Sequence, residues 1–467
     1  MTIPQHARAT FSLRSYTGRP AVDGTDGLPR LYGPEAARPQ ELFARLRARD
    51  GQVSPVMLPG DLPVWLVLGH RANLDVARTP SRFSRDSRRW NLLRSGQVPA
   101  DWPLRPMVEW EPSVVFSDGE EHERTRAAIV AGLAAENRAG IRRYVKRYTE
   151  QLVNLVIERG HADLISEYAE RLPMLVMTRL LGLDEAEGPR LADAARDLIR
   201  GSDTAVASNE LIKQTLIRLI ATKKARPGRD FASRLIAHES RLQDSELLSH
   251  LRLTLIAANE TTANLIANTL ERVLTDGRFR AHLAGGQMTL PDALDGVLWD
   301  EPPLSTVPGR WATGDSQLGG WRIEGGDMLL LCPGAANVDP EIRPDLSVPV
   351  HGNRSHLAFS AGPHRCPGDD LGRAIADTGI DTLMALLPDL RLAVPQADLD
   401  WHHVLLSKRL SRLPVEFQAR PRVALGSTRG AARRTGAGPG AAGGCPVTHG
   451  ASAPAPTPSS DVWASTV

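Results

Sequence analysis

The 467-residue sequence contains only three cysteines, at positions 332, 366 and 445. They are too few and too scattered for a disulfide framework or a four-ligand zinc site. A reducing compartment fits such cysteine usage, and we expect a cytoplasmic protein. Cys332, in LLLCPG, is interpreted as a buried small apolar residue, and Cys445 lies in a Gly-rich stretch near the end of the chain.

Long apolar runs and an excess of one charge are also missing. No stretch approaches the roughly 20 apolar residues of a membrane span. The N-terminal MTIPQHARATFSLRSY has no apolar core of signal-peptide length. The formal net charge is only +2, which gives no reason to expect binding to polyanions. We therefore expect neither nucleic acid nor a membrane among the partners.

The composition predicts one large globular domain between two less regular ends. Hydrophobic residues make up 42% and charged residues 24% of the chain, as in globular proteins. Residues 1–34 look irregular, and residues 35–425 are assigned to the domain. Residues 426–467 are mainly Gly, Ala, Pro, Ser and Thr, with almost nothing to bury, so we predict a disordered tail.

Helical periodicity dominates the middle of the chain. Apolar residues recur at spacings of three and four over 138–160 and 162–181. Residues 245–276 form one long helical pattern that is apolar on nearly every side, so this helix should run through the centre of the molecule. Shorter strand patterns occur at 64–68 and 328–331. The fold class is therefore predicted to be mainly α.

The segment FSAGPHRCPGDDLGRAIA, residues 359–376, carries the strongest chemical signal. Cys366 follows a Gly-Pro turn and precedes a helix predicted to start near Pro367. Free backbone N–H groups and the helix dipole at such a position lower a thiol pKa and favour the metal-binding thiolate. Phe359 places an apolar ring near the sulfur, while Gly362 and Gly368 suit a tight turn or a large flat ligand.

The pattern F-x-x-G-x-x-x-C-x-G, filled by Phe359, Gly362, Cys366 and Gly368, resembles the haem-ligand loop of the cytochrome P450 family. The alternative is a buried, inert cysteine at a helix start. The resemblance covers roughly residues 35–420. It implies the haem-thiolate fold, mainly α with a small β-rich lobe. It also implies haem b (iron protoporphyrin IX) as cofactor, with Cys366 as the axial ligand of its iron.

A second resemblance lies in the long apolar helix. Ala257 to Thr262 read AANETT, which is similar to the family's A-G-x-E/D-T-T segment. An isolated Glu-Thr pair on a helix is usually solvated or capping, but inside an apolar helix buried polar groups need a reason. The resemblance implies that Thr261 hydrogen-bonds dioxygen in the site and that Glu260 helps to relay protons. Ala258 departs from the family, which usually has glycine there.

Four basic residues resemble the family's contacts to the haem propionates, which need cations or donors when buried. His122 and Arg126 are four residues apart and therefore share a helix face. His364 lies two residues before the cysteine. Arg310 resembles the basic residue on the strand after the family's E-x-x-R helix. Each of them alone could equally be a surface charge.

The E-x-x-R pair of the family is missing. Counting back from the Pro302-Pro303 turn, its two positions hold Gly296 and Trp299. Replacing both members of a buried ion pair can leave the folding stability nearly unchanged, whereas removing only one lowers it by about 3–5 kcal/mol. Asp295 offers a carboxylate one residue early, turned by about 100° around the helix. Arg354 is the nearest candidate for the arginine that usually joins this network. These departures predict a divergent subgroup that still folds and captures haem.

The resemblance implies a monooxygenase that inserts one atom of O2 into an apolar small organic molecule. No flavin or nicotinamide domain is visible in the sequence, so electrons would come from a separate ferredoxin and ferredoxin reductase. The alternative is a haem-binding redox or ligand sensor, or a regulatory protein, with little oxygenase turnover. The lost pair, Ala258 and two acids on the donor-docking face, Asp369 and Asp370, suggest it. Basic residues that can offset these acids are Arg124, Arg142, Arg143, Lys146, Arg147 and Arg373.

Overall fold

The computed structural model describes residues 8, 11–16, 27–102, 104–200, 204–350, 352–403 and 406–424. The predicted tail at 426–467, including Cys445, lies outside the described residues. Within the N-terminal segment predicted to be irregular, two short 3-10 turns form, η2 (Leu13–Tyr16) and η3 (Gly33–Ala36). Leu13 and Leu31 are buried. Part of this segment therefore contributes to the core.

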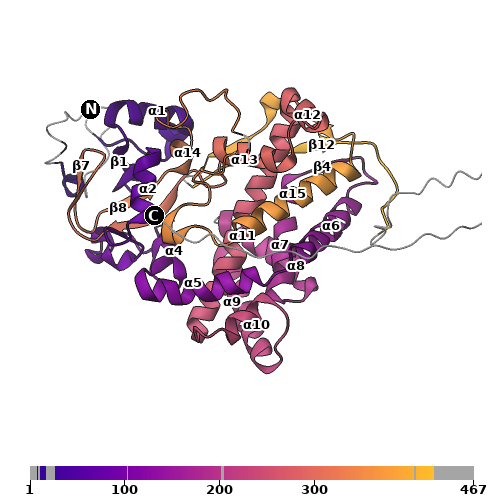
Figure 1. Cartoon of the computed structure of the whole chain (residues 1–467), viewed down its shortest axis with the longest axis horizontal. Helices are drawn as coiled ribbons and strands as arrows, with labels where there is room; N and C mark the ends of the chain where they lie inside the picture. Colours follow the sequence, from indigo (N-terminus) through magenta and orange to yellow (C-terminus); the bar gives the residue numbers. More distant parts are fainter. Residues whose placement is uncertain are drawn as a thin grey trace, which may run out of the picture. The chain divides into compact units, whose positions relative to one another are not determined.

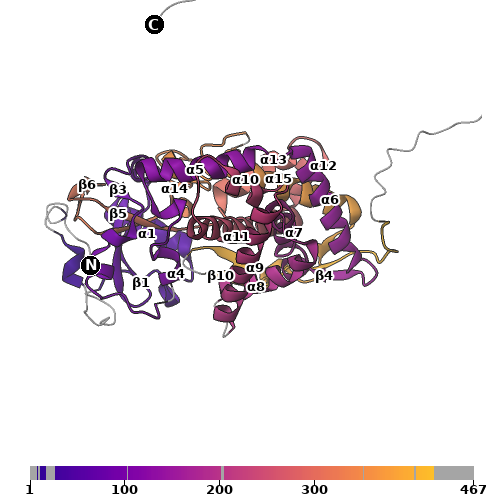
Figure 2. The ribbon, with the colours of Figure 1, turned by 90° about the horizontal axis from the view of Figure 1, so that it is seen from below.

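Helices make up most of the described chain (Figure 1). The long predicted helix is confirmed as α11 (Asp244–Thr275), which opens with a capping box between Gln243 and Glu246. It contacts α7, α9, α13 and α15 and passes between them (Figure 2). The other helices are α1 (Pro39–Asp50), α2 (His70–Arg78), α3 (Asn91–Arg94), α4 (Arg105–Val108), α5 (Gly119–Ala134), α6 (Arg138–Asn154), α7 (Leu172–Leu181), α8 (Gly188–Arg200), α9 (Ala205–Ala225), α10 (Phe231–Ala237), α12 (Gly277–Ala284), α13 (Leu290–Asp300), α14 (Pro333–Ala336) and α15 (Asp369–Leu386).

The helix predicted over 162–181 is broken into three pieces. The chain first forms strand β4 (His161–Asp163), then a π-helical turn (Ile165–Ala169), and only then α7. Asp163 explains the break, because its carboxylate accepts hydrogen bonds from the backbone N–H groups of Ile165 at 3.1 Å and Leu413 at 2.9 Å. This pairing with a distant strand is invisible to local periodicity.

A five-stranded sheet of order β1-β2-β8-β5-β3 forms the β-rich part. Its strands are β1 (Val53–Leu58), β2 (Leu62–Val67), β3 (Phe83–Ser84), β5 (Val307–Ala312) and β8 (Met328–Leu331). The strands predicted at 64–68 and 328–331 are confirmed as β2 and β8, which pair in parallel. β2 is buried along its whole length, which explains its unbroken apolar run. The smaller strands are β4, β6 (Ser316–Leu318), β7 (Trp321–Ile323), β9 (Arg391–Leu392), β10 (Trp401–His403), β11 (Lys408–Leu410) and β12 (Pro414–Glu416).

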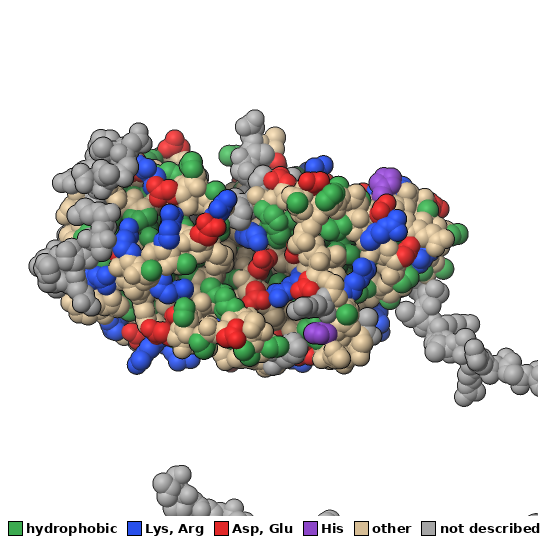
Figure 3. Space-filling model, turned by 90° about the horizontal axis from the view of Figure 1, so that it is seen from above, with side chains coloured by type: hydrophobic (Ala, Val, Ile, Leu, Met, Phe, Trp, Pro, Cys, Tyr) green, Lys and Arg blue, Asp and Glu red, His purple; other side chains and the backbone are tan. Residues whose placement is uncertain are grey.

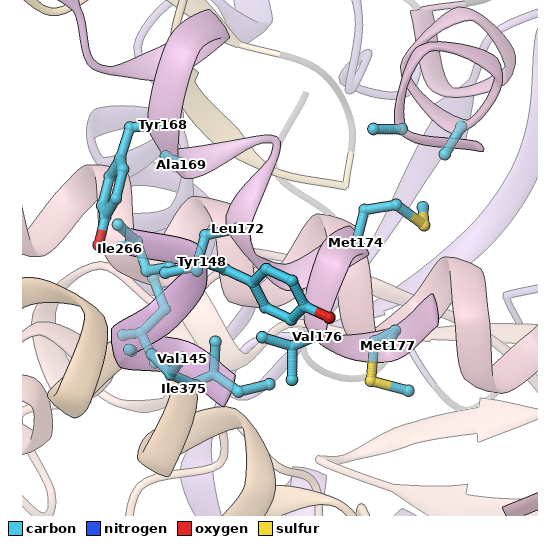
Figure 4. Close-up of a cluster of buried hydrophobic side chains, with 14 of the residues drawn as sticks. Val145, Tyr148, Tyr168, Ala169, Leu172, Met174, Val176, Met177, Ile266 and Ile375 are labelled. Atoms are coloured by element: carbon cyan, nitrogen blue, oxygen red, sulfur yellow. The ribbon is translucent and has the colours of Figure 1, made fainter. Parts of the chain in front are cut away.

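The main core fixes α15 against α6, α7 and α11. Figure 4 shows side chains of these helices meeting, among them Val145 of α6, Leu172 of α7, Ile266 of α11 and Ile375 of α15. The Tyr168 hydroxyl donates to the Gly379 carbonyl of α15 at 2.7 Å. Because α15 directly follows the Cys366 segment, this packing holds that segment beside α11.

The face drawn in Figure 3 carries no dominant charge. Acidic and basic side chains are interspersed over the face drawn in Figure 3, in keeping with the small net charge. Within the described part of the chain, the helices are all too short or too polar to span a bilayer.

Candidate active site

A cavity of about 320 Å³ lies between α5, α11, β5 and the segment that contains Cys366. Most residues predicted from the sequence as site residues line it: His122, Arg126, Thr261, Arg310, Phe359, His364, Cys366 and Gly368. Two predicted residues, Glu260 and Gly362, are not part of its described lining. The cavity therefore brings together residues from four separate parts of the sequence.

The ligand loop, residues 359–368, folds back on itself around Cys366. The backbone N–H of Cys366 donates to the Phe359 carbonyl at 2.9 Å. Gly362 has a φ of +67°, and a Cβ there would lie 2.3 Å from the carbonyl oxygen of Ala77 in α2. Only glycine fits both the backbone conformation and the space. Gly362 therefore lets the loop pack closely against α2 and is not part of the described cavity lining.

Two details of the predicted Cys366 environment are wrong. Helix α15 begins at Asp369 with Gly368 as N-cap, two residues later than Pro367. In addition, the pKa of the Cys366 thiol is raised rather than lowered. Burial is the main cause, and it outweighs the Gly368 N–H and the charge of Arg126, which act in the opposite direction. By itself the chain therefore keeps this sulfur as a thiol.

The predicted basic residues converge on one side of the cavity. His122 and Arg126 both lie on α5, as their spacing predicted. His122 is 3% exposed, and its Nε2 has no hydrogen-bond partner among the described residues. Arg310 is also 3% exposed, and its guanidinium donates to the adjacent Gly309 carbonyl at 3.4 Å. Burial lowers the pKa of Arg310 well below its ordinary value, so this buried cation lacks an adequate counter-ion.

Sequence reasoning missed Arg85 and Asp118. The half-buried Arg85 lines the cavity and donates to the carbonyls of Val115 and Gly309, both at 2.7 Å. Asp118 accepts a hydrogen bond from His364 Nε2 at 3.1 Å. Asp118 directly precedes α5, at its N-cap position, and Arg85 directly follows the two-residue strand β3. Nothing local therefore pointed to either residue.

The resulting electrostatics favour an anionic ligand. Burial, together with Arg126, lowers the pKa of His122 to about 4. Burial, together with Arg310 and Arg85, lowers the pKa of His364 to about 3. Asp118 offsets only part of the charge of Arg85 and Arg310, so the site has unmet positive charge and, at His122, an orphaned imidazole nitrogen. A ligand with two carboxylates beside a large apolar body, such as haem, fits these donors.

The two residues of the predicted oxygen-activation pair face different surroundings. Thr261 lines the cavity, and its hydroxyl donates to the Ala257 carbonyl at 2.7 Å. Glu260 precedes it by one residue, about 100° around the helix. Its carboxylate lies 3.6 Å from Arg409 Nη1 of β11 and accepts a hydrogen bond from the Asn264 amide at 3.3 Å. Any role for Glu260 in the cavity therefore requires its side chain to leave Arg409.

The region of the missing E-x-x-R pair contains a different ion pair. Gly296 and Trp299 are neutral as expected, yet the carboxylate one residue early, Asp295, is 2% exposed and forms an ion pair with Arg373 of α15. Arg354 Nε lies 3.6 Å from the same carboxylate. A buried ion pair is therefore present after all, shifted by one position on α13.

Comparison with known proteins settles the family. No protein-family model matches the chain. However, cytochrome P450 monooxygenase PikC of Streptomyces venezuelae is 30% identical over 415 residues, covering 86% of this chain and 94% of that protein. The chain belongs to the cytochrome P450 family. Vitamin D(3) 25-hydroxylase of Pseudonocardia autotrophica is 29% identical and covers 85% of this P450 and 98% of that protein. The solved structure of CYP154C4 from Streptomyces sp. W2061 has a TM-score of 0.73 at 29% identity, covering 80% of this chain and 94% of that one.

These comparisons confirm the predicted family and the fold, mainly α with a small β-rich lobe. They also confirm the enzyme class, because the relatives are named monooxygenases and hydroxylases. This P450 is a monooxygenase that acts on small molecules.

The buried histidines predict acid sensitivity of the cofactor-free protein. In the unfolded chain His122 and His364 take up protons near pH 6.5, but in the folded chain only near pH 4 and pH 3. Between these limits the unfolded state binds more protons, so stability should fall as the pH falls from about 6.5 to 4, by about 1.4 kcal/mol per pH unit for each histidine. Urea unfolding at pH 7 and pH 5 measures this. The double variant His122→Gln, His364→Gln should show a shallower pH dependence, and an equal slope would contradict the assignment.

Proposed function

We propose that this P450 monooxygenase binds haem b through the thiolate of Cys366 and oxidises an apolar small organic molecule with O2. Electrons come from a separate ferredoxin and ferredoxin reductase. The observation that carries the proposal is the cavity itself, in which Cys366 and the arginines Arg85, Arg126 and Arg310 share mostly apolar walls. The catalytic domain is assigned to residues 35–425, and the protein to the cytoplasm.

The residues divide into two groups around the cofactor. Cys366 would supply the iron ligand. Burial raises the pKa of its thiol, but a coordinated metal ion would deprotonate it. Arg126, Arg310, His122 and His364 would hold the propionates, and we add Arg85 to this group because it lines the same cavity. When bound, the haem supplies the activation of dioxygen, and its thiolate ligand favours O–O cleavage.

The substrate side of the cavity favours an apolar molecule. Thr261 presents its hydroxyl there, and we assign to its Oγ1 the proton that is passed into the site. Once its carboxylate has left Arg409, Glu260 would take up a proton from solvent water and pass it to Thr261. Side chains without charge form the surrounding wall, among them Val114, Val115, Met177, Leu253, Ala257, Ala258, Leu304 and Val307. The hydroxylation of vitamin D(3) named for one relative is in keeping with such a substrate.

An acidic ferredoxin can dock in spite of Asp369 and Asp370. Asp369 pairs with Arg365 at 2.6 Å, and Asp370 pairs with Arg138, so both acids are offset locally. Three of the basic residues predicted to offset them are engaged elsewhere, namely Arg124 with Glu246, Arg147 with Glu185 and Arg373 with Asp295. Arg142, Arg143 and Lys146 on α6 remain exposed and provide the positive face for the donor.

A coupled turnover assay tests this function. The holoprotein, a surrogate ferredoxin and its reductase are supplied with NADPH and a panel of apolar compounds, and both NADPH consumption and oxygenated product are measured. Substrate-dependent product formation is expected. A thiolate-type haem spectrum without turnover on any compound would favour the sensor alternative. Well-folded protein without bound haem would refute both proposals.

A further inference from the structure

The buried carboxylate of Asp295 lies among cations that come from a different part of the chain. Its partner Arg373 is on α15, seven residues after Cys366, with its side chain 13% exposed. His356, 2% exposed, lies 4.0 Å from the same carboxylate. Arg373 Nη2 donates to His356 Nε2 at 2.9 Å. Burial and the neighbouring Arg373 lower the pKa of His356 to about 3, so the ring is a neutral acceptor.

Arg373 also contacts the ligand loop directly. Its guanidinium carbon lies 5.3 Å from the centre of the Phe359 ring, within the range of a cation–π contact. The His356 ring lies 5.8 Å from the same ring. The backbone carbonyl of Phe359 in turn accepts the hydrogen bond from the N–H of Cys366. A continuous set of contacts therefore runs from α13 to the cysteine.

The position of Arg373 in this set of contacts depends on the negative charge of Asp295. Without its carboxylate, the guanidinium of Arg373 would be nearly buried beside the positively charged Arg354 and a neutral histidine. Such a cation moves towards solvent or draws in water rather than stay unpaired. Either movement removes it from the Phe359 ring. Gly296 and Trp299, its neighbours on α13, cannot supply a replacement charge.

We propose that Asp295 and Arg373 are positioning residues that hold Phe359, and through it the backbone of Cys366, in the geometry required for a stable cysteine–iron bond. The inference rests on the proposed function, in which Cys366 is the haem ligand. Asp295 acts on Arg373 by charge, and Arg373 acts on Phe359 and His356 by its planar, donor-rich shape. These residues thus support the ligand loop from Asp295, one residue before the first position of the missing E-x-x-R pair.

The test uses Asp295→Asn in the haem-loaded, full-length protein. This change keeps the shape of the side chain and removes its charge. The reduced protein is treated with carbon monoxide, and conversion of the thiolate-type band into the shifted band of thiolate-free haem is followed over time. We expect the conversion to be about tenfold faster than in the unsubstituted protein, as for coupled residues of one network. Asp300→Asn is the matched control, since Asp300 lies on α13 and pairs with Arg272 and Arg343. Its conversion rate should be unchanged.

A second variant, Arg373→Lys, carries the test if Asp295→Asn does not fold. Lysine keeps the charge for Asp295 but lacks the planar fork that faces His356 and Phe359. Its conversion should also be accelerated. Conversion as slow as in the unsubstituted protein, in a variant whose thermal melting is lowered, would show a merely structural pair and overturn this inference alone. Absence of the thiolate-type band from the unsubstituted protein would overturn the proposed function, and the inference with it.

Discussion

Cys366→Ala is expected to abolish the thiolate-type spectrum of the reduced, carbon monoxide-treated protein. The sulfur of Cys366 lines the cavity, and the other described cysteine, Cys332, is fully buried elsewhere in the sheet core. No second thiolate among the described residues can therefore replace it. Burial raises the pKa of the Cys332 thiol to about 12, so that sulfur stays protonated. The measurement is the carbon monoxide difference band, expected at about 450 nm only when a thiolate is the axial ligand.

Cys332→Ala is the matched control for this prediction. It removes the sulfur of a wholly buried cysteine at the end of β8, so it should lower stability by about 1 kcal/mol. The spectral band should remain in full. A Cys366→Ala protein that keeps the thiolate-type band would refute the ligand assignment.

Trp299→Arg, the second large change, is expected to destabilise the protein by about 3 kcal/mol or more. Trp299 is 2% exposed, its indole N–H donates to the Asn353 carbonyl at 2.7 Å, and the Arg343 guanidinium lies 5.4 Å from its ring. An arginine here would lose the hydrogen bond and place a second buried cation beside Arg343. The two α13 carboxylates on either side are already paired, Asp295 with Arg373 and Asp300 with Arg272 and Arg343. Thermal or urea unfolding measures the loss.

Gly296→Ala provides the control on the same helix. A Cβ at Gly296 meets nothing within 4 Å, so alanine should be neutral or should stabilise α13 by up to about 1 kcal/mol. Should Trp299→Arg raise the melting temperature instead, the new guanidinium would have found a carboxylate. Asp295, one helical turn earlier, would be the candidate, and its present pairing with Arg373 would be wrongly assigned.

The fold was predictable where a local sequence pattern alone determines a helix or a strand. The 32-residue α11 is buried on all sides from Thr262 to Leu270, where other helices enclose it, and β8 matches its predicted range, Met328–Leu331. The break after Asp163 was not predictable. Its cause is a pairing with β12, some 250 residues later, while the local sequence keeps helical periodicity.

The candidate site was likewise predictable only where a local pattern indicates a residue. The loop motif and the spacing of His122 and Arg126 identified residues that line the cavity, because both patterns are local. The raised pKa of Cys366 was missed, since desolvation depends on what surrounds the sulfur in space. The pairing of Asp295 with Arg373 joins two helices 78 residues apart. No pattern within α13 alone could reveal it.

X-ray absorption at the iron edge of the purified holoprotein tests the central claim most directly, because it reports the atoms bound to the metal. The proposed function predicts one sulfur ligand in the unsubstituted protein and in Cys332→Ala, and none in Cys366→Ala. An iron with only nitrogen or oxygen ligands in the unsubstituted protein would contradict it.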